Sequence, residues 1–206
     1  EIGIRINPRG LLYSVPGISS WVGGDLTAGI LATELDQSEE IGMLIDVGTN
    51  GEIIIGNREW LIATSASAGP ALEGASVDCG MMAEEGAIEK VRAEDGRVVC
   101  ETIGGAPPEG LCGSGIIDLV AVMLETGIID RSGQLVQDAS ASVVEVEGIK
   151  RFVLVPAAES GTGEDLYITQ DEVENVITAK AAIFAAAKIV LDRLKLKFSD
   201  IKKLFL

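Results

Sequence analysis

The residues best suited to chemistry lie in the stretch Leu44–Gly56, which reads LIDVGTNGEIIIG. An apolar run typical of a buried strand ends at Asp46, and the chain then turns through Gly48, Thr49 and Asn50 before a second apolar run. Glycine lets a backbone approach an anion closely, and the N–H groups and threonine hydroxyl of such a turn can bind phosphate oxygens. A carboxylate at the strand end can hold Mg²⁺ through water. A plain β-hairpin with an Asn-Gly turn fits the same pattern, so this stretch alone leaves both interpretations open.

Two other polar clusters are bracketed by glycines. The run GLCGSGIIDLV places Gly113, Ser114 and Gly115 at the expected start of a helix, where free N–H groups and the helix dipole attract anions. The run VGGDLTAG places Asp25 at the start of another helix. A serine N-cap and an aspartate N-cap are the ordinary alternatives. Because three such clusters accompany apolar elements, we expect them to share one open cleft that binds an anion.

The composition excludes several classes of protein. Asp and Glu number 32 against 16 Lys and Arg, and this net charge of −16 repels nucleic acid. The chain has no histidine, which excludes Ser-His and Cys-His nucleophile pairs. Its three cysteines are scattered without a CxxC pair, which argues against an iron–sulfur or zinc site in this chain and favours a reducing compartment. No apolar run reaches about 18 residues. We therefore expect a cytoplasmic protein without a membrane or nucleic-acid partner.

The elements that position these clusters are predicted to form an α/β fold. Aromatic residues make up only 4% of the chain, so the core must be aliphatic, as in sheets covered by helices. Strands are predicted over Leu11–Val15, Ile41–Val47, Glu52–Gly56, Glu59–Thr64, Ala87–Arg92, Arg97–Thr102 and Arg151–Val155. The three strands between residues 41 and 64 are expected to form one antiparallel meander, with Asn50-Gly51 as its first turn. Residues 128–150 are expected to be irregular.

Three helices are predicted between and after these strands. One begins near Asp25, a second begins at Gly113, and the longest covers Gln170–Leu194. Thr169 and Glu172 have the spacing of a capping box at the start of the longest helix. Its alanine-rich face suits close packing, so we expect it to lie on the meander.

The motifs DVGTNGE, SAGPALEG, GLCGSG and TQDEVENVITAKAAI, in this order, resemble one family. It is the C-terminal ATPase domain of the reductive activators of corrinoid proteins, which usually also carry an N-terminal iron–sulfur ferredoxin domain. That domain belongs to the superfamily of acetate and sugar kinases, heat-shock ATPases and actin. The resemblance covers nearly the whole chain and implies an actin-like ATPase lobe with a ribonuclease H-like mixed sheet and helices packed on it.

The resemblance also implies roles for the glycine-bracketed clusters. ATP and Mg²⁺ are the implied cofactors, and Asp25 and Asp46 are the implied catalytic residues. Asp46 would face the metal, and Asp25 would orient water or magnesium. The residues implied to bind the nucleotide are Gly48, Thr49, Asn50, Gly113, Ser114 and Gly115.

The resemblance further implies that residues 1–206 form mainly the second lobe of the ATPase domain, as a fragment of a longer chain. An earlier DIGTTT-type phosphate hairpin and a later adenosine loop do not occur in this sequence. The final run DIKKLFL reads as a strand that has only begun. We therefore expect half of a nucleotide site here, and an iron–sulfur cluster only in a missing N-terminal domain.

In such activators, ATP hydrolysis is coupled to delivery of a low-potential electron to cobalt, which returns an inactivated corrinoid protein to the Co(I) state. The implied partners are a corrinoid protein and a nucleotide. ATPase activity is expected of the full-length protein but not of this chain alone. Two alternatives stay open: a kinase-like phosphotransferase of the same superfamily, and a non-catalytic interaction module that keeps the fold.

Overall fold

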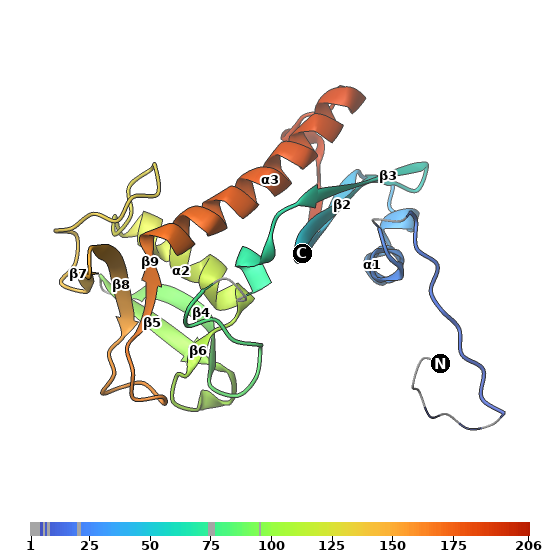
Figure 1. The fold of residues 1–206 in the computed structure, drawn as a ribbon. Helices are drawn as coiled ribbons and strands as arrows, with labels where there is room; N and C mark the ends of the chain where they lie inside the picture. The colour runs from blue at the N-terminus through green and yellow to red at the C-terminus, as the bar shows by residue number, and fades with distance from the viewer. Residues whose placement is uncertain (1–4, 6, 8, 20–21, 74–76, 95) are drawn as a thin grey trace.

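A computed structural model describes residues 5, 7, 9–19, 22–73, 77–94 and 96–206. The elements form two groups, and the longest helix runs along both of them (Figure 1). The first group comprises α1 (Gly24–Thr33), β1 (Gly42–Val47), β2 (Asn50–Asn57), β3 (Trp60–Ser67) and β10 (Lys203–Phe205). The second comprises β4 (Ala87–Glu94), β5 (Arg97–Thr102), β6 (Gly110–Leu111), α2 (Gly113–Glu125), β7 (Val143–Val146), β8 (Ile149–Val155) and β9 (Leu166–Thr169). The long helix is α3 (Gln170–Leu194).

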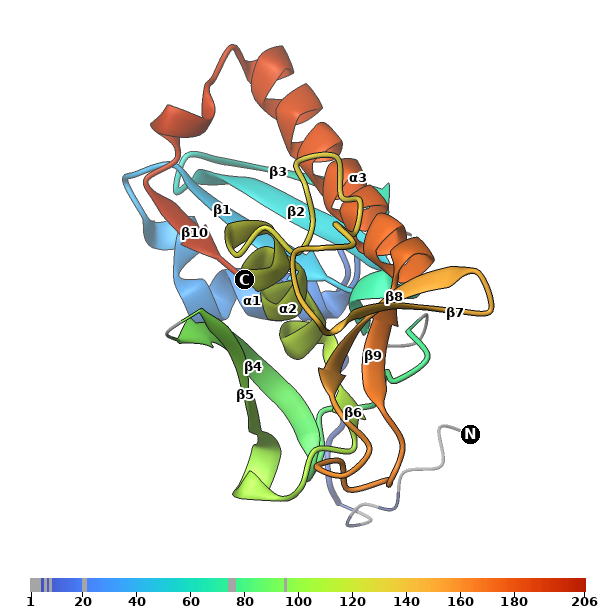
Figure 2. The same ribbon diagram turned by 90° about the vertical axis from the view of Figure 1, so that its left-hand side faces the viewer.

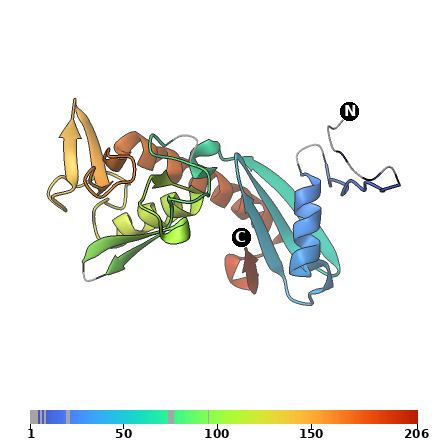
Figure 3. The ribbon, with the colours of Figure 1, turned by 90° about the horizontal axis from the view of Figure 1, so that it is seen from below.

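The first group is a mixed sheet of four strands in the order β10-β1-β2-β3 (Figure 2). The strands β1, β2 and β3 form the predicted antiparallel meander, and β10 joins β1 in parallel. Side chains alternate between the two faces of a strand. Leu44 and Ile54 therefore pack with α1 in one apolar cluster, while Ile53 and Ile55 pack with α3 in the other. The strand β2 is thus buried on both faces, and Figure 3 shows α1 and α3 on different sides of the sheet.

The first turn of the meander differs from the prediction. Val47 pairs with Gly51, so three residues, Gly48, Thr49 and Asn50, connect this pair in place of a two-residue Asn-Gly turn, and Asn50 already pairs with β3. None of these residues has the positive φ that such a turn requires. Gly51 is needed for a different reason, because a Cβ at this position would overlap the side chain of Ile183 on α3.

The second group contains two sheets of three strands, β5-β4-β6 and β7-β8-β9. The predicted hairpin of β4 and β5 is confirmed. The prediction that residues 128–150 are irregular is wrong from Val143 onward, where β7 and β8 form a hairpin. Its two-residue turn is Glu147-Gly148, and both residues have positive φ. An Asn-Gly or Asp-Gly pair would have indicated this turn more strongly than Glu-Gly does.

The helices follow the sequence closely. The helix α3 has the predicted bounds and the predicted capping box between Thr169 and Glu172. It packs on β2 and β3 as expected and also contacts β8, β9 and α2. The predicted strand at Leu11–Val15 is wrong, because this segment is exposed and pairs with no other strand among the described residues. Within that described part, no helix is both long and apolar enough to cross a membrane.

Candidate functional site

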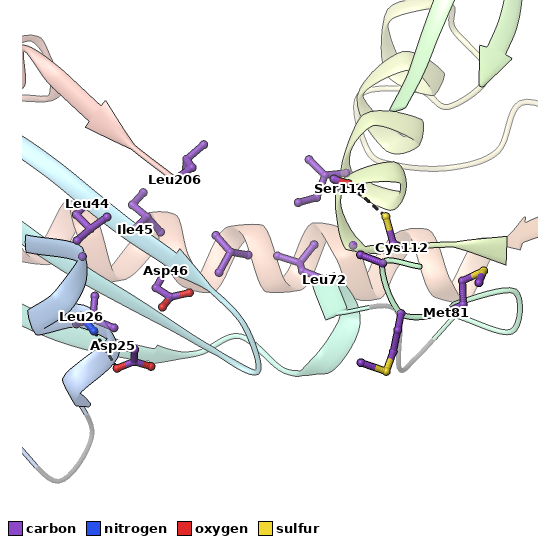
Figure 4. Close-up of a pocket in the computed structure, with 16 residues that line it drawn as sticks. Asp25, Leu26, Leu44, Ile45, Asp46, Leu72, Met81, Cys112, Ser114 and Leu206 are labelled. Atoms are coloured by element: carbon purple, nitrogen blue, oxygen red, sulfur yellow. Dashed lines mark hydrogen bonds between the residues drawn. The ribbon is translucent and has the colours of Figure 1, made fainter. Parts of the chain in front are cut away.

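An open pocket of about 720 Å³ lies between the two groups of elements. Asp25 and Asp46 lie on one side, whereas Cys112 and Ser114 lie on the opposite side (Figure 4). We call the first side, formed by α1 and β1, the carboxylate wall. We call the second side, formed by residues 81–83 and 112–117, the helix-start wall.

Local glycines place Asp25 in the carboxylate wall. The N-cap of α1 is Gly23, and Asp25 does not cap the helix. A Cβ on Gly23 would lie 2.5 Å from Asp25 Oδ1, so the glycine leaves the room that this carboxylate occupies. Asp25 Oδ1 accepts a hydrogen bond of 2.9 Å from the N–H of Leu26. The ordinary alternative of an aspartate N-cap is therefore wrong, and the carboxylate stays exposed to the pocket.

Asp46 lies near the end of β1, directly opposite Glu52 on β2. Burial raises the pKa of Glu52 above its ordinary value of 4.5, and the negative charges of Asp46 and Asp25 raise it further. No lysine or arginine is present among the described residues that line the pocket. The carboxylate wall therefore carries negative charge without a protein cation to balance it.

The helix-start wall offers the opposite polarity. The helix α2 has 13 residues, and its N-cap is Cys112, whose side chain makes no capping hydrogen bond. The Cys112 thiol instead lies 3.3 Å from Ser114 Oγ and 3.3 Å from the carbonyl of Ile88. The alternative of a serine N-cap is wrong, since Ser114 is already inside the helix. Gly113 and Ser114 in the first turn of α2 line the pocket, and a helix N-terminus without a side-chain cap favours anions.

These two walls fit a phosphate group bound together with Mg²⁺. Magnesium usually takes one or two protein carboxylates, several waters and substrate phosphates. Within the described part of the chain, no group of three or more acidic, cysteine or histidine residues could hold a metal alone. Asp46 and Asp25 supply the number of carboxylates that such a shared site needs, and the phosphate oxygens and water would complete it.

The structure brings together four of the eight predicted site residues: Asp25, Asp46, Gly113 and Ser114 line the pocket. The other four are not among the lining residues. Gly48, Thr49 and Asn50 form the turn beyond Asp46, and Gly115 is buried against β4, where a Cβ would overlap the carbonyl of Ile88.

Sequence reasoning missed several apolar and sulfur-containing residues of the pocket, namely Leu72, Met81, Met82, Cys112 and Leu206. The adjacency of Cys112 to Gly113 and the place of Leu72 in the motif SAGPALEG could have indicated two of them. Met81 and Met82 lie in a segment without periodicity, and their place depends on long-range contacts.

Two features indicate the class of protein: a mixed sheet that lies between two helices, and a pocket whose two walls have opposite polarity. The chain has the actin-like ATPase fold, called ASKHA, and this fold implies nucleotide binding with a divalent metal. The chain belongs to the family of reductive activators of corrinoid proteins: residues 40–206 match the family model described as the C-terminal domain of RACo, the ASKHA domain. Residues 1–38 match the RACo middle region, so the boundary between the two matches falls between α1 and β1.

Named relatives agree with this assignment. The chain is 35% identical over 209 residues to the corrinoid activation enzyme RamQ of Eubacterium limosum, covering 98% of this chain and 35% of the relative. It is 26% identical to the [Co(II) methylated amine-specific corrinoid protein] reductase of Methanosarcina barkeri, covering 91% of this chain and 35% of that protein.

A solved structure agrees as well. A reductive activator for corrinoid, iron–sulfur protein superposes with a TM-score of 0.90 at 45% identity, covering 98% of this chain and 32% of that one. The chain therefore spans 32% to 35% of the length of these relatives.

Proposed function

We propose that this chain is the ATP-binding part of a reductive activator that returns inactivated corrinoid proteins to the Co(I) state. One observation carries the proposal: the pocket sets Asp25 and Asp46 opposite the start of α2, in a chain of the reductive-activator family. The names of the relatives support a corrinoid protein as the partner.

Each wall has a proposed task. Asp46 holds Mg²⁺, directly or through water, and Asp25 orients a water molecule or the ion. The N–H groups at Gly113 and Ser114 bind phosphate oxygens, because the helix dipole favours negative charge there. Gly48, Thr49 and Asn50 are proposed to contact phosphate from the turn beside Asp46, and Gly115 keeps α2 close to β4. When bound, Mg²⁺ would neutralise part of the phosphate charge.

Residues 1–206 are proposed to form mainly the second lobe of the ATPase domain. Binding of ATP between two lobes stabilises the closed geometry, and this makes an otherwise unfavourable reduction accessible. The iron–sulfur cluster is proposed to belong to another domain, since Cys79, Cys100 and Cys112 are separate free thiols here. Free thiols also support the reducing cytoplasm as the proposed location.

ATP turnover tests this function. We expect this chain to be a poor ATPase, because hydrolysis in the superfamily needs donors from both lobes aimed at one phosphate. The same protein extended at both ends to the length of its relatives should hydrolyse ATP. In the extended protein, Asp46→Ala should lower turnover by about 10²–10³, the usual cost of losing one electrostatic contact in an active site.

The matched control is Asp138→Ala, which removes an exposed carboxylate remote from the pocket and should leave turnover unchanged. Equal turnover by the short and extended proteins would contradict the lobe assignment. Transfer of phosphate to a small acid or sugar would favour the phosphotransferase alternative.

A further inference from the structure

Glu172 is the one charged side chain that is buried in the part of the chain that the structure describes, with only 6% of its surface exposed. It lies in the first turn of α3. Among the described residues, no lysine or arginine forms an ion pair with it. A buried carboxylate without a cation is costly unless hydrogen bonds satisfy both oxygens.

The two carboxylate oxygens of Glu172 bind different parts of the chain. Oε2 accepts hydrogen bonds from the Thr169 N–H at 2.6 Å and the Thr169 hydroxyl at 2.9 Å, which closes the capping box. Oε1 accepts a hydrogen bond of 2.5 Å from the backbone N–H of Asp78, 94 residues earlier in the sequence. The capping box does not need this second contact, so Oε1 anchors another segment to α3.

The anchored segment leads directly into the helix-start wall. After Asp78, the carbonyl of Cys79 accepts a hydrogen bond of 2.7 Å from the Leu111 N–H, and the Met81 N–H donates one of 2.9 Å to the Leu111 carbonyl. Met81 lines the pocket, and so do the residues that follow Leu111 at the start of α2. Both parts of this wall are therefore joined to each other and, through Asp78, to Glu172.

The helix α3 suits this anchoring because it also contacts the sheet of the carboxylate wall. Ile183, farther along α3, packs where Gly51 leaves room on β2, and β2 pairs with the strand that carries Asp46. This helix of 25 residues thus contacts the strand next to β1 at one point and, through Glu172, the segment that leads into the helix-start wall at another.

We propose that Glu172 is a positioning residue for the nucleotide pocket. Its Oε1 holds the Asp78 N–H and thereby fixes the helix-start wall at a set distance from Asp46. The inference rests on the proposed function, because the ligand whose phosphates bridge the two walls is taken to be MgATP.

Two substitutions separate this role from helix capping. In Glu172→Gln, only one side-chain oxygen remains as an acceptor. Thr169 offers two donors to that oxygen and Asp78 offers one, so the amide should keep the cap and turn its NH₂ group toward the Asp78 N–H. Thr169→Ala removes the capping hydroxyl but keeps the bond to Asp78. Asp78→Ala is a further control, since it removes the carboxylate that accepts a hydrogen bond of 3.1 Å from the Tyr167 hydroxyl and leaves the backbone N–H that Glu172 binds in place.

The first measurement is hydrogen exchange of the Met81 and Leu111 amides, which needs no nucleotide. Glu172→Gln should speed their exchange by about tenfold or more through local opening, whereas Thr169→Ala and Asp78→Ala should change it by less than about twofold. The second measurement is MgATP affinity in the protein extended to the length of its relatives. There, Glu172→Gln should weaken binding by about tenfold, and the two controls should not.

Equal exchange in the Glu172→Gln and Thr169→Ala proteins would overturn the inference, because Glu172 would then act only as a cap. Faster exchange with unchanged MgATP affinity would also overturn it. A wild-type extended protein that does not bind MgATP would refute the proposed function and the nucleotide part of the inference. The exchange data would then still decide whether Glu172 holds the helix-start wall.

Discussion

The two walls of the pocket differ in how far apart in the sequence the residues lie that hold them in place. Asp46 lies on a strand whose neighbour β2 follows it directly in the chain, and apolar side chains fix both faces of that sheet. Gly113 follows a strand of only two residues, β6, which pairs with β4 and with the segment that Glu172 anchors. The carboxylate wall is thus positioned mainly by local sequence, and the helix-start wall by residues far apart in the chain.

The walls also differ in charge, and the difference gives the pocket its chemistry. The carboxylate wall brings Asp25 and Asp46 together, and burial together with their charges raises the pKa of the neighbouring Glu52. The helix-start wall presents a helix N-terminus without a side-chain cap. Neither feature alone identifies a ligand, but a metal and a phosphate together match both.

We expect the largest difference between the two walls in folding free energy, when the buried glycines Gly115 and Gly51 are each replaced by alanine. Gly115→Ala places a Cβ against the carbonyl of Ile88, which cannot move without disturbing β4, and should cost about 3 kcal/mol of folding free energy. Gly51→Ala places a Cβ against Cγ1 of the buried Ile183, a side chain rather than backbone, and should cost less, about 2 kcal/mol. Urea unfolding of the two variants measures the difference. Equal costs would contradict the idea that the helix-start wall is the less tolerant of the two.

A smaller effect tests the charge on the carboxylate wall. Because the pKa of Glu52 is raised in the folded state, its ionisation costs stability at neutral pH, and this cost disappears as the pH falls through the raised pKa toward 4.5. Glu52→Gln should therefore raise the free energy of unfolding by about 0.5 kcal/mol at pH 7, a size typical of cross-strand pairs that solvent partly screens. Denaturant unfolding at pH 7 and pH 4 measures it. A gain that is as large at pH 4 as at pH 7 would contradict the electrostatic cause.

The smallest effect concerns a thiol next to the anchored segment. Burial raises the pKa of Cys79 and Cys100 above 9.0, so both should react slowly with iodoacetamide at pH 8. The negative charge of Glu172 raises the pKa of Cys79 further but does not act on Cys100. Glu172→Gln should therefore make Cys79 react faster, both because its pKa falls and because the segment that Glu172 anchors opens, while Cys100 stays unchanged, as followed by mass spectrometry. An equal increase at both thiols would indicate general loosening instead.

The sequence by itself determined the elements that depend on neighbours in the chain. The continuous apolar run of Ile53, Ile54 and Ile55 is typical of a strand buried on both faces, and the capping box at Thr169 and Glu172 predicts where α3 begins. The order of the glycine-bracketed motifs predicted the family, which the family model confirms. These signals suffice because strands, caps and turns are decided by interactions over a few residues.

Only the tertiary structure decided how the pocket is assembled. Gly113 and Ser114 lie opposite Asp46, whereas Gly48, Thr49 and Asn50 are not among the residues that line the pocket. Gly51 is needed for packing against α3 and not for a two-residue turn. The tertiary structure also revealed the contact between Glu172 and Asp78. The physical reason is that such contacts join residues up to 94 positions apart, where a local pattern carries no information about which side chains meet.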